Sequence, residues 1–140
     1  MTKTIWMFPG QGSQATGMGQ DMLELATAKA KFATASEILG WSVGERCNGD
    51  IDTLSQTRYT QPCLYVVEAA IADELKAKGN TPDYVAGHSL GEYVALYAAS
   101  VFDFETGLKL VQQRANLMNQ ASGGKMAALI GFKRDELEAA

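Results

Sequence analysis

The feature that most constrains this chain is the pentapeptide Gly87-His88-Ser89-Leu90-Gly91, which stands between two apolar segments. Tyr84–Gly87 predicts a short buried strand, and the Ala-, Leu- and Tyr-rich segment Leu90–Ala99 predicts a buried helix. A G-x-S-x-G sequence in that context is typical of a nucleophile elbow, a tight strand-to-helix turn that exposes the serine hydroxyl. The glycines leave room for the turn, and the helix N-terminus favours negative charge on a reacting oxygen. We therefore predict that Ser89 is a nucleophile. The simpler alternative is a glycine-lined turn in which the serine caps the helix.

The rest of the chain alternates between predicted strands and helices, which predicts an α/β fold with a parallel sheet flanked by helices. The length of 140 residues suits one domain with a sizeable core. Further strands are expected at Thr4–Phe8 and Met126–Ile130, and a loop with one helical turn at Gly40–Thr60. A helix is expected at Asp21–Leu39 with a break near Thr27, and another from a Thr60 N-cap, with Pro62 in its first turn, to Gly79. A third helix is expected to begin at an Asp103 N-cap, and its inner face consists of Leu108, Val111, Ala115 and Met118. A fourth begins at Lys133. That last helix has only begun where the chain stops, which indicates a cut through a longer protein.

Charge and composition exclude several classes of partner. The chain has 12 Lys and Arg against 16 Asp and Glu, a net charge of −4, and no basic run, which argues against nucleic acid and anionic membranes. Neither a signal-peptide stretch nor the roughly 18 apolar residues of a membrane helix is present. The two cysteines, Cys47 and Cys63, form no metal-like pair or disulfide framework and suit a reducing compartment. We expect a cytoplasmic protein.

A serine nucleophile needs a base to take its proton, and the sequence offers a poor one. His88 is the one histidine of the chain, and it is the immediate neighbour of Ser89. Adjacent side chains leaving a strand point in opposite directions, so we expect His88 to pack beneath the elbow. The 140 residues therefore contain a candidate nucleophile without a candidate base.

A second Gly-rich loop follows the first predicted strand, at Phe8–Gln14. Gly10–Ala15 matches the dinucleotide fingerprint G-x-G-x-x-A, but that fingerprint needs a second strand and an acidic residue roughly 20 positions later. The corresponding region, Lys29–Glu37, has a helical pattern, and no Lys-Ser or Lys-Thr follows for a phosphate loop. What remains is a loop at the carboxyl edge of a parallel sheet, whose backbone N–H groups can complete an oxyanion hole with that of Leu90.

Four short motifs together resemble a known family. FPGQGSQ near the N-terminus, TQP before a helix, GHSLGEY at the elbow and QQRANLM further on occur in this order. The set resembles the malonyl-CoA:acyl carrier protein transacylases, the acyltransferases of type II fatty acid synthesis. Acyltransferase domains of polyketide synthases are similar but less close. The resemblance covers essentially the whole chain and implies that residues 1–140 form the N-terminal part of the large α/β hydrolase-like subdomain of an acyltransferase.

The resemblance implies a role for each site residue. Ser89 would carry the malonyl group, and the backbone N–H groups of Gln11 and Leu90 would form the oxyanion hole. Arg114 would bind the free malonyl carboxylate, as suits a guanidinium that pairs bidentately and stays charged. The implied substrates are malonyl-CoA and the phosphopantetheine of acyl carrier protein, without a metal or redox cofactor. Ala115 stands where the family usually has glycine.

The chain also departs from the family. Its members carry a catalytic histidine well beyond position 140 and a ferredoxin-like subdomain that closes the cleft, and this chain contains neither. We therefore expect the 140 residues alone to be inactive in transfer. Two other interpretations stay open: an α/β-hydrolase-type serine esterase, and a non-catalytic fragment that binds acyl carrier protein.

Overall fold

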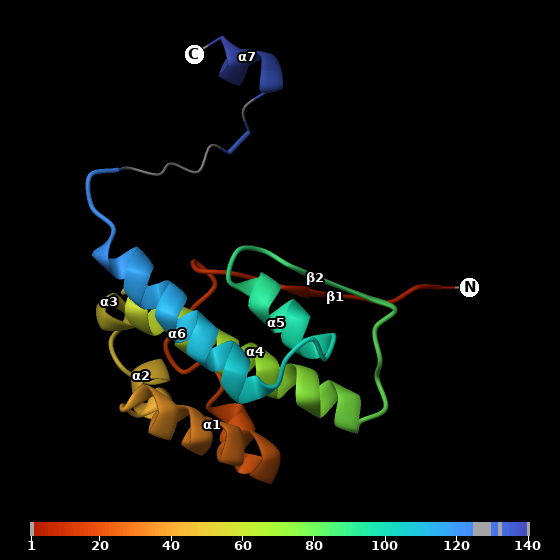
Figure 1. Ribbon diagram of the computed structural model, residues 1–140. Helices are drawn as coiled ribbons and strands as arrows, with labels where there is room; N and C mark the ends of the chain where they lie inside the picture. The colour runs from red at the N-terminus through yellow and green to blue at the C-terminus, as the bar shows by residue number, and fades with distance from the viewer. Residues whose placement is uncertain (1, 125–129, 132, 140) are drawn as a thin grey trace.

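The computed structural model describes residues 2–124, 130–131 and 133–139, and within them it is an α/β fold. Strands β1 and β2 lie side by side, α5 packs on them, α4 and α6 run together beneath, and α1 covers the far side of α4 (Figure 1). The predicted parallel sheet flanked by helices is confirmed. In chain order the elements are β1 (Ile5–Phe8), η1 (Asp21–Glu24), α1 (Ala26–Leu39), α2 (Val43–Cys47), α3 (Ile51–Leu54), α4 (Thr57–Ala77), β2 (Tyr84–Gly87), α5 (Gly91–Ala98), α6 (Phe104–Gln120) and α7 (Arg134–Glu138).

The sheet consists of the two strands that the sequence predicted near Thr4–Phe8 and at Tyr84–Gly87. They pair in parallel, with Ile5 opposite Tyr84 and Phe8 opposite Gly87. Because side chains alternate along a strand, Trp6 and Phe8 turn inward, whereas Ile5 is 55% exposed. The predicted strand at Met126–Ile130 falls on residues 125–129, which lie outside the described residues.

Helix α4 begins earlier than the sequence predicted. The Thr60-Gln61-Pro62 pattern placed its N-cap at Thr60, but the helix begins at Thr57, with Gln56 as N-cap. The Thr60 hydroxyl instead donates to the carbonyl oxygen of Leu54 at 2.6 Å, which ties α4 to α3. Pro62 therefore lies inside the helix, in its second turn.

The segment Gly40–Thr60 is more ordered than the predicted loop, because it contains both α2 and α3. Each begins at a polar N-cap: the Ser42 hydroxyl accepts from the N–H of Glu45, and the Asp50 carboxylate accepts from the N–H of Thr53. The predicted helix Asp21–Leu39 divides at Leu25 into η1 and α1, close to the expected break at Thr27.

Helices α4 and α6 form the centre of the core. Asp103 caps α6 as predicted, with its carboxylate 2.7 Å from the N–H of Thr106. Leu108, Val111 and Ala115 are buried as expected, and Met118, although 40% exposed, directs its sulfur toward the buried Gln61 of α4 at 3.3 Å. No helix in the described part of the chain is both long and apolar enough to cross a membrane.

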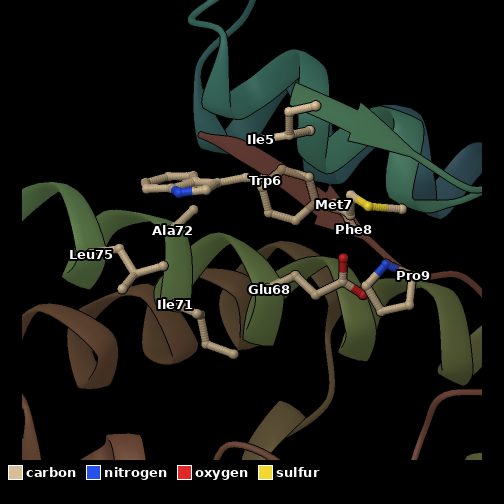
Figure 2. Close-up of a pocket in the computed structure, with 9 residues that line it drawn as sticks. All are labelled: Ile5, Trp6, Met7, Phe8, Pro9, Glu68, Ile71, Ala72 and Leu75. Atoms are coloured by element: carbon tan, nitrogen blue, oxygen red, sulfur yellow. The ribbon is translucent and has the colours of Figure 1, made fainter. Parts of the chain in front are cut away.

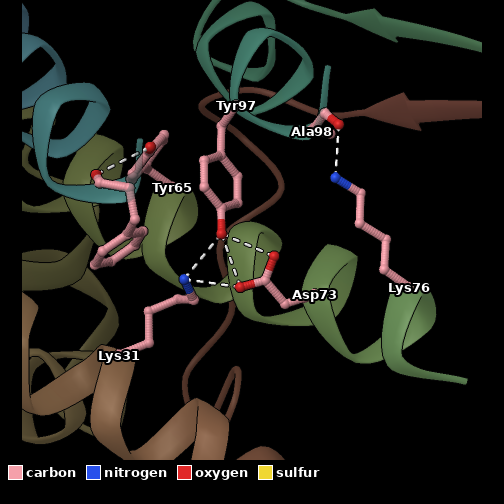
Figure 3. Close-up of polar contacts among 7 residues, drawn as sticks. Lys31, Tyr65, Asp73, Lys76, Tyr97 and Ala98 are labelled. Atoms are coloured by element: carbon pink, nitrogen blue, oxygen red, sulfur yellow. Dashed lines mark hydrogen bonds and ion pairs between the residues drawn. The ribbon is translucent and has the colours of Figure 1, made fainter. Parts of the chain in front are cut away.

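A polar cluster holds α5 against α4 and α1. The Tyr97 hydroxyl on α5 donates to the Asp73 carboxylate on α4, and Lys31 on α1 pairs with Asp73 at 2.8 Å (Figure 3). The Lys31 ammonium also lies 4.0 Å from the centre of the Phe104 ring, a cation–π contact. Lys76 donates to the carbonyl oxygen of Ala98 at 2.7 Å, which closes the C-terminal end of α5. Helix α5 is thus fixed at the end opposite Ser89.

Candidate active site

Ser89 lies at the apex of a tight turn between β2 and α5. Its backbone has a φ of 55°, in the left-handed region that side-chain-bearing residues rarely adopt. The residue is exposed, whereas the neighbouring Leu90 side chain is fully buried and anchors the turn. A strained serine presented between strand and helix is the arrangement that the G-x-S-x-G pattern predicted.

The two glycines of the motif are required by backbone contact. A Cβ on Gly91 would overlap the carbonyl oxygen of Phe8, and a Cβ on Gly87 would overlap the backbone of Gly91. Helix α5 therefore approaches both strands at backbone distance, and no larger residue fits without moving the helix.

Arg114 brings a positive charge to the nucleophile. It projects from α6, and its Nη2 donates to the Ser89 Oγ at 2.9 Å. Its Nη1 donates to the Gln61 Oε1 of α4, so both ends of the guanidinium fork are occupied. The ring of Tyr93 lies 5.8 Å from the guanidinium carbon. Arg114 therefore reaches the elbow across 25 positions of sequence.

Gln61 and Met118 belong to this site, and sequence reasoning missed both. Gln61 is fully buried, and its Nε2 contacts the Met118 sulfur at 3.3 Å while its Oε1 receives Arg114. A buried amide with partners on both sides fixes the orientation of the guanidinium. The available signal was the TQP motif, which predicted a helix N-cap and contributed to the family resemblance but gave Gln61 no role.

The loop after β1 lies against the elbow. A Cβ on Gly10 would overlap the carbonyl oxygen of His88, so this loop and the elbow meet at backbone distance. The backbone N–H groups of Gln11 and Leu90 donate to no other backbone group of the described residues. The Gln11 side chain is held by the Thr57 hydroxyl at 2.8 Å. Both N–H groups that the resemblance implies for an oxyanion hole therefore lie at the same edge of the sheet and are available.

His88 does not pack beneath the elbow as expected. It is exposed, with its Nδ1 beside Gly10. It lines an open pocket together with Met7, Phe8, Pro9, Ala86 and Gly87. In the described part of the chain, no imidazole or carboxylate is hydrogen-bonded to the Ser89 hydroxyl, which accepts from Arg114.

The described side chains do not form a metal-binding cluster. Within residues 2–124, 130–131 and 133–139, no three His, Cys, Asp or Glu side chains are close enough together to hold a metal ion. Cys47 and Cys63 are both buried and free. What the site offers chemically is an exposed hydroxyl, free backbone donors and one fixed guanidinium.

The comparisons with known proteins agree on one family. The model of the acyl transferase domain family matches residues 5–139. The malonyl CoA-acyl carrier protein transacylase of Synechocystis is 64% identical over 138 residues, 99% of this chain and 47% of that protein. The crystal structure of the Synechocystis transacylase superposes with a TM-score of 0.96 and 63% identity, over 99% of this chain and 47% of that chain.

A third comparison includes a bound partner. It is a malonyl-transacylase in complex with a type II polyketide acyl-carrier protein, which matches with a TM-score of 0.82 and 38% identity. The match covers 87% of this chain and 40% of that one. The chain thus spans about half the length of the curated transacylases that it matches.

Proposed function

Since the chain belongs to the acyl transferase domain family, we propose that it forms the nucleophile-bearing part of a malonyl-CoA:acyl carrier protein transacylase of type II fatty acid synthesis. The observation that carries the proposal is the 2.9 Å hydrogen bond between Arg114 and the Ser89 hydroxyl. A fixed cation this close to Ser89 supports a partner for the free carboxylate of a malonyl group on Ser89. A dicarboxylic acyl group needs such a partner, because an unpaired charge is costly to enclose.

In the first half-reaction, the Ser89 Oγ attacks the thioester carbonyl carbon of malonyl-CoA. The carbonyl oxygen gains negative charge, which the backbone N–H groups of Gln11 and Leu90 stabilise. The carbon–sulfur bond then breaks, the coenzyme A thiol leaves with a proton, and the malonyl group remains on Ser89 as an ester. Arg114 moves its hydrogen bond from the hydroxyl to the malonyl carboxylate, so that the guanidinium keeps a partner throughout.

In the second half-reaction, the phosphopantetheine thiol of acyl carrier protein attacks the ester carbonyl. The ester carbon–oxygen bond breaks, Ser89 recovers its proton, and the malonyl group leaves on the carrier. The proposal of this partner is supported by the transacylase names of the relatives and by the carrier-protein complex among the structural matches. The site needs neither a metal ion nor a redox cofactor for these two steps.

Both half-reactions move a proton at Ser89, and we infer that the base comes from outside the described residues. Arg114 holds the hydroxyl but stays protonated, so it cannot accept that proton. We therefore expect the 140-residue chain to bind without turnover. A hybrid protein, in which this chain replaces the matching 138 residues of the Synechocystis transacylase, would restore the base.

The experiment is mass spectrometry of this hybrid after incubation with malonyl-CoA. A malonyl adduct is expected on the peptide that contains Ser89, and Ser89→Ala should abolish it. Ser100→Ala is the matched control, because Ser100 is also exposed with a left-handed φ of 61°. An adduct that persists in the Ser89→Ala protein, or that lies on another residue, would exclude Ser89 as the nucleophile.

Two other functions are distinguished by the same hybrid. A serine esterase would pass the acyl group to water and would have no use for the guanidinium at Ser89. A non-catalytic carrier-binding fragment is favoured by the lack of a base bonded to Ser89 in the described residues. Malonyl release into water at the rate of transfer supports the first, and carrier binding without any adduct supports the second.

A further inference from the structure

Met118 is linked to the nucleophile through Gln61. Arg114 and Met118 lie one helical turn apart on α6, so both side chains project from the same face of that helix. They meet at one amide of α4, because the Gln61 Oε1 accepts from Arg114 and the Gln61 Nε2 donates to the Met118 sulfur at 3.3 Å. Arg114 in turn donates to the Ser89 hydroxyl. A change at the sulfur can therefore reach Ser89 through these hydrogen bonds.

The Met118 sulfur determines the orientation of the Gln61 amide. Gln61 is fully buried, and among the described residues its Nε2 has no acceptor other than this sulfur. A thioether accepts hydrogen bonds and donates none, so it selects the orientation in which Nε2 faces the sulfur and Oε1 faces Arg114. A guanidinium has donors alone. With the amide reversed, the donors of Gln61 and of Arg114 would face each other without an acceptor.

The Gln61 oxygen is the lasting anchor of Arg114. Arg114 takes part in none of the ion pairs of the described residues. Its hydrogen bonds go to Gln61 and to the Ser89 hydroxyl, which becomes an ester in the proposed reaction. Once Ser89 carries an acyl group, Gln61 is the described residue that still orients the guanidinium.

The Met118 sulfur is also open to chemical modification. The residue is 40% exposed, whereas Met22 is 8% exposed. Because Gln61 occupies one lone pair of the sulfur, a hydroperoxide meets the other lone pair. With hydrogen peroxide, the sulfur bonds to one oxygen and the O–O bond breaks. The proton of the transferred oxygen passes to the departing hydroxide, which leaves as water. The sulfur loses two electrons, the peroxide gains them, and the product is a sulfoxide.

We propose that Met118 is a site of reversible oxidation by hydroperoxides, and that its sulfoxide releases Gln61 and so weakens the binding of a malonyl carboxylate by Arg114. The sulfur of a sulfoxide is positively polarised and no longer accepts from Nε2, and the polar new group is drawn toward water. A buried amide without an acceptor is costly, so Gln61 rotates and its Oε1 leaves Arg114. This inference rests on the proposed function, because it concerns regulation of the same site.

The first test treats the Synechocystis hybrid with hydrogen peroxide. Peptide mapping should show one added oxygen on Met118 and none on Met22. The kcat/KM for malonyl transfer should then fall by about fivefold, chiefly through KM, while that for acetyl transfer changes by less than about twofold. Methionine sulfoxide reductase with a thiol reductant should restore malonyl transfer. The thiol reductant alone should not restore it, which separates Met118 from oxidation of Cys47 or Cys63.

Two substitutions of Met118 sharpen this test. Met118→Leu keeps the apolar bulk without an acceptor, so it should show the loss of about fivefold before peroxide and no further loss after it. Met118→Gln offers Gln61 a carbonyl oxygen that peroxide does not modify, so it should keep its preference for malonyl in peroxide. The proposal is overturned by an unmodified Met118, by an unchanged malonyl-to-acetyl ratio after its oxidation, or by an equal effect of peroxide on Met118→Leu.

A measurement without substrate separates this proposal from the proposed function. In NMR spectra of the isotope-labelled hybrid, the side-chain amide signals of Gln61 are assigned by their loss in Gln61→Leu. They should shift when Met118 is oxidised and in Met118→Leu, whereas peroxide should not shift them in Met118→Gln. Signals that stay in place on oxidation would overturn the proposal, whatever the hybrid transfers. Signals that shift while Ser89 forms no malonyl adduct would support the release of Gln61 and contradict the proposed function.

Discussion

The two sides of β1 differ in how completely their groups are partnered. Toward β2 and α5, Phe8 meets Gly91 at backbone distance, and Arg114 donates to the Ser89 hydroxyl at the elbow. Toward α4, the backbone of Met7 and the carboxyl of Glu68 have no partner among the described residues (Figure 2). The elbow side is thus closely packed within these residues, whereas the side facing α4 leaves buried polar groups without a partner among them. The comparison predicts that changes on the elbow side destabilise and that a change at Glu68 stabilises.

The largest effect is expected where the elbow is packed most closely. Gly91→Ala should lower the free energy of unfolding by at least about 4 kcal/mol, because the added methyl group meets backbone that cannot rotate away. Gly124→Ala is the control, since no described residue lies within 4 Å of a Cβ at that position. Urea unfolding of both variants measures the difference. A loss of unfolding free energy similar to that of the control would show that α5 can shift, and the elbow side would then not be closely packed.

The next effect concerns the specificity of the site. In the hybrid, Arg114→Ala should lower kcat/KM for malonyl transfer by about 3 kcal/mol of transition-state binding, because a carboxylate loses its bidentate partner. Acetyl transfer should fall less or rise, since an acetyl group leaves the guanidinium unpaired. Arg58→Ala, an exposed arginine on α4, controls for a change in net charge. Equal losses for both thioesters would make Arg114 a structural residue only.

A smaller effect, of opposite direction, is expected at Glu68. Burial raises the pKa of its carboxyl from 4.5 to about 8. The folded isolated chain therefore holds a proton that the unfolded chain loses, so stability is greatest below pH 4.5 and falls as the pH rises to about 8. Glu68→Gln should flatten this profile and raise stability at pH 9 by about 2 kcal/mol. Thermal unfolding between pH 4 and 9 measures this pH dependence of the stability, with Glu74→Gln as control. A wild-type profile as flat as that of the variant contradicts an unpartnered carboxyl.

The smallest effect concerns the strain at the elbow. Ser89→Ala and Ser89→Gly remove the same hydroxyl, but only glycine adopts a φ of 55° without strain. The glycine variant should therefore be about 1 kcal/mol more stable than the alanine variant. The same pair of substitutions at Ser100, with a φ of 61°, should give a similar difference. An alanine variant as stable as the glycine variant would show that the turn relaxes once the hydroxyl is gone.

The elbow could be predicted from sequence because its causes are local. Two glycines four positions apart, between an apolar strand pattern and a helix pattern, define the turn at Ser89 without reference to the rest of the chain. The Asp103 cap is a similar case, since the carboxylate and the N–H that donates to it are three residues apart. The position of Arg114 came instead from the family resemblance, because helix periodicity alone predicts a solvated side chain there.

The parts that sequence reasoning missed depend on packing between distant segments. Gln61 reaches Met118 and Arg114 from another helix, and no local pattern indicates that pairing. Thr60 bonds back to Leu54, so a residue typical of an N-cap became an interior one. Glu68 shares a helix face with Leu64, Ile71 and Leu75, but only the position of β1 reveals that its carboxyl is enclosed.

The parallel pairing of β1 with β2 also determines the order in which this fold can be completed. Strand β1 leaves the ribosome before β2, which follows only after the whole segment from Pro9 to Asp83 has been synthesised. Closing so long a loop is slow unless the intervening helices have already packed. We therefore expect the helical layer of α1 to α4 to fold first and the strands to join late. Until then Ile5–Phe8 is an unpaired apolar segment, and chaperone binding during synthesis should concentrate on these N-terminal residues.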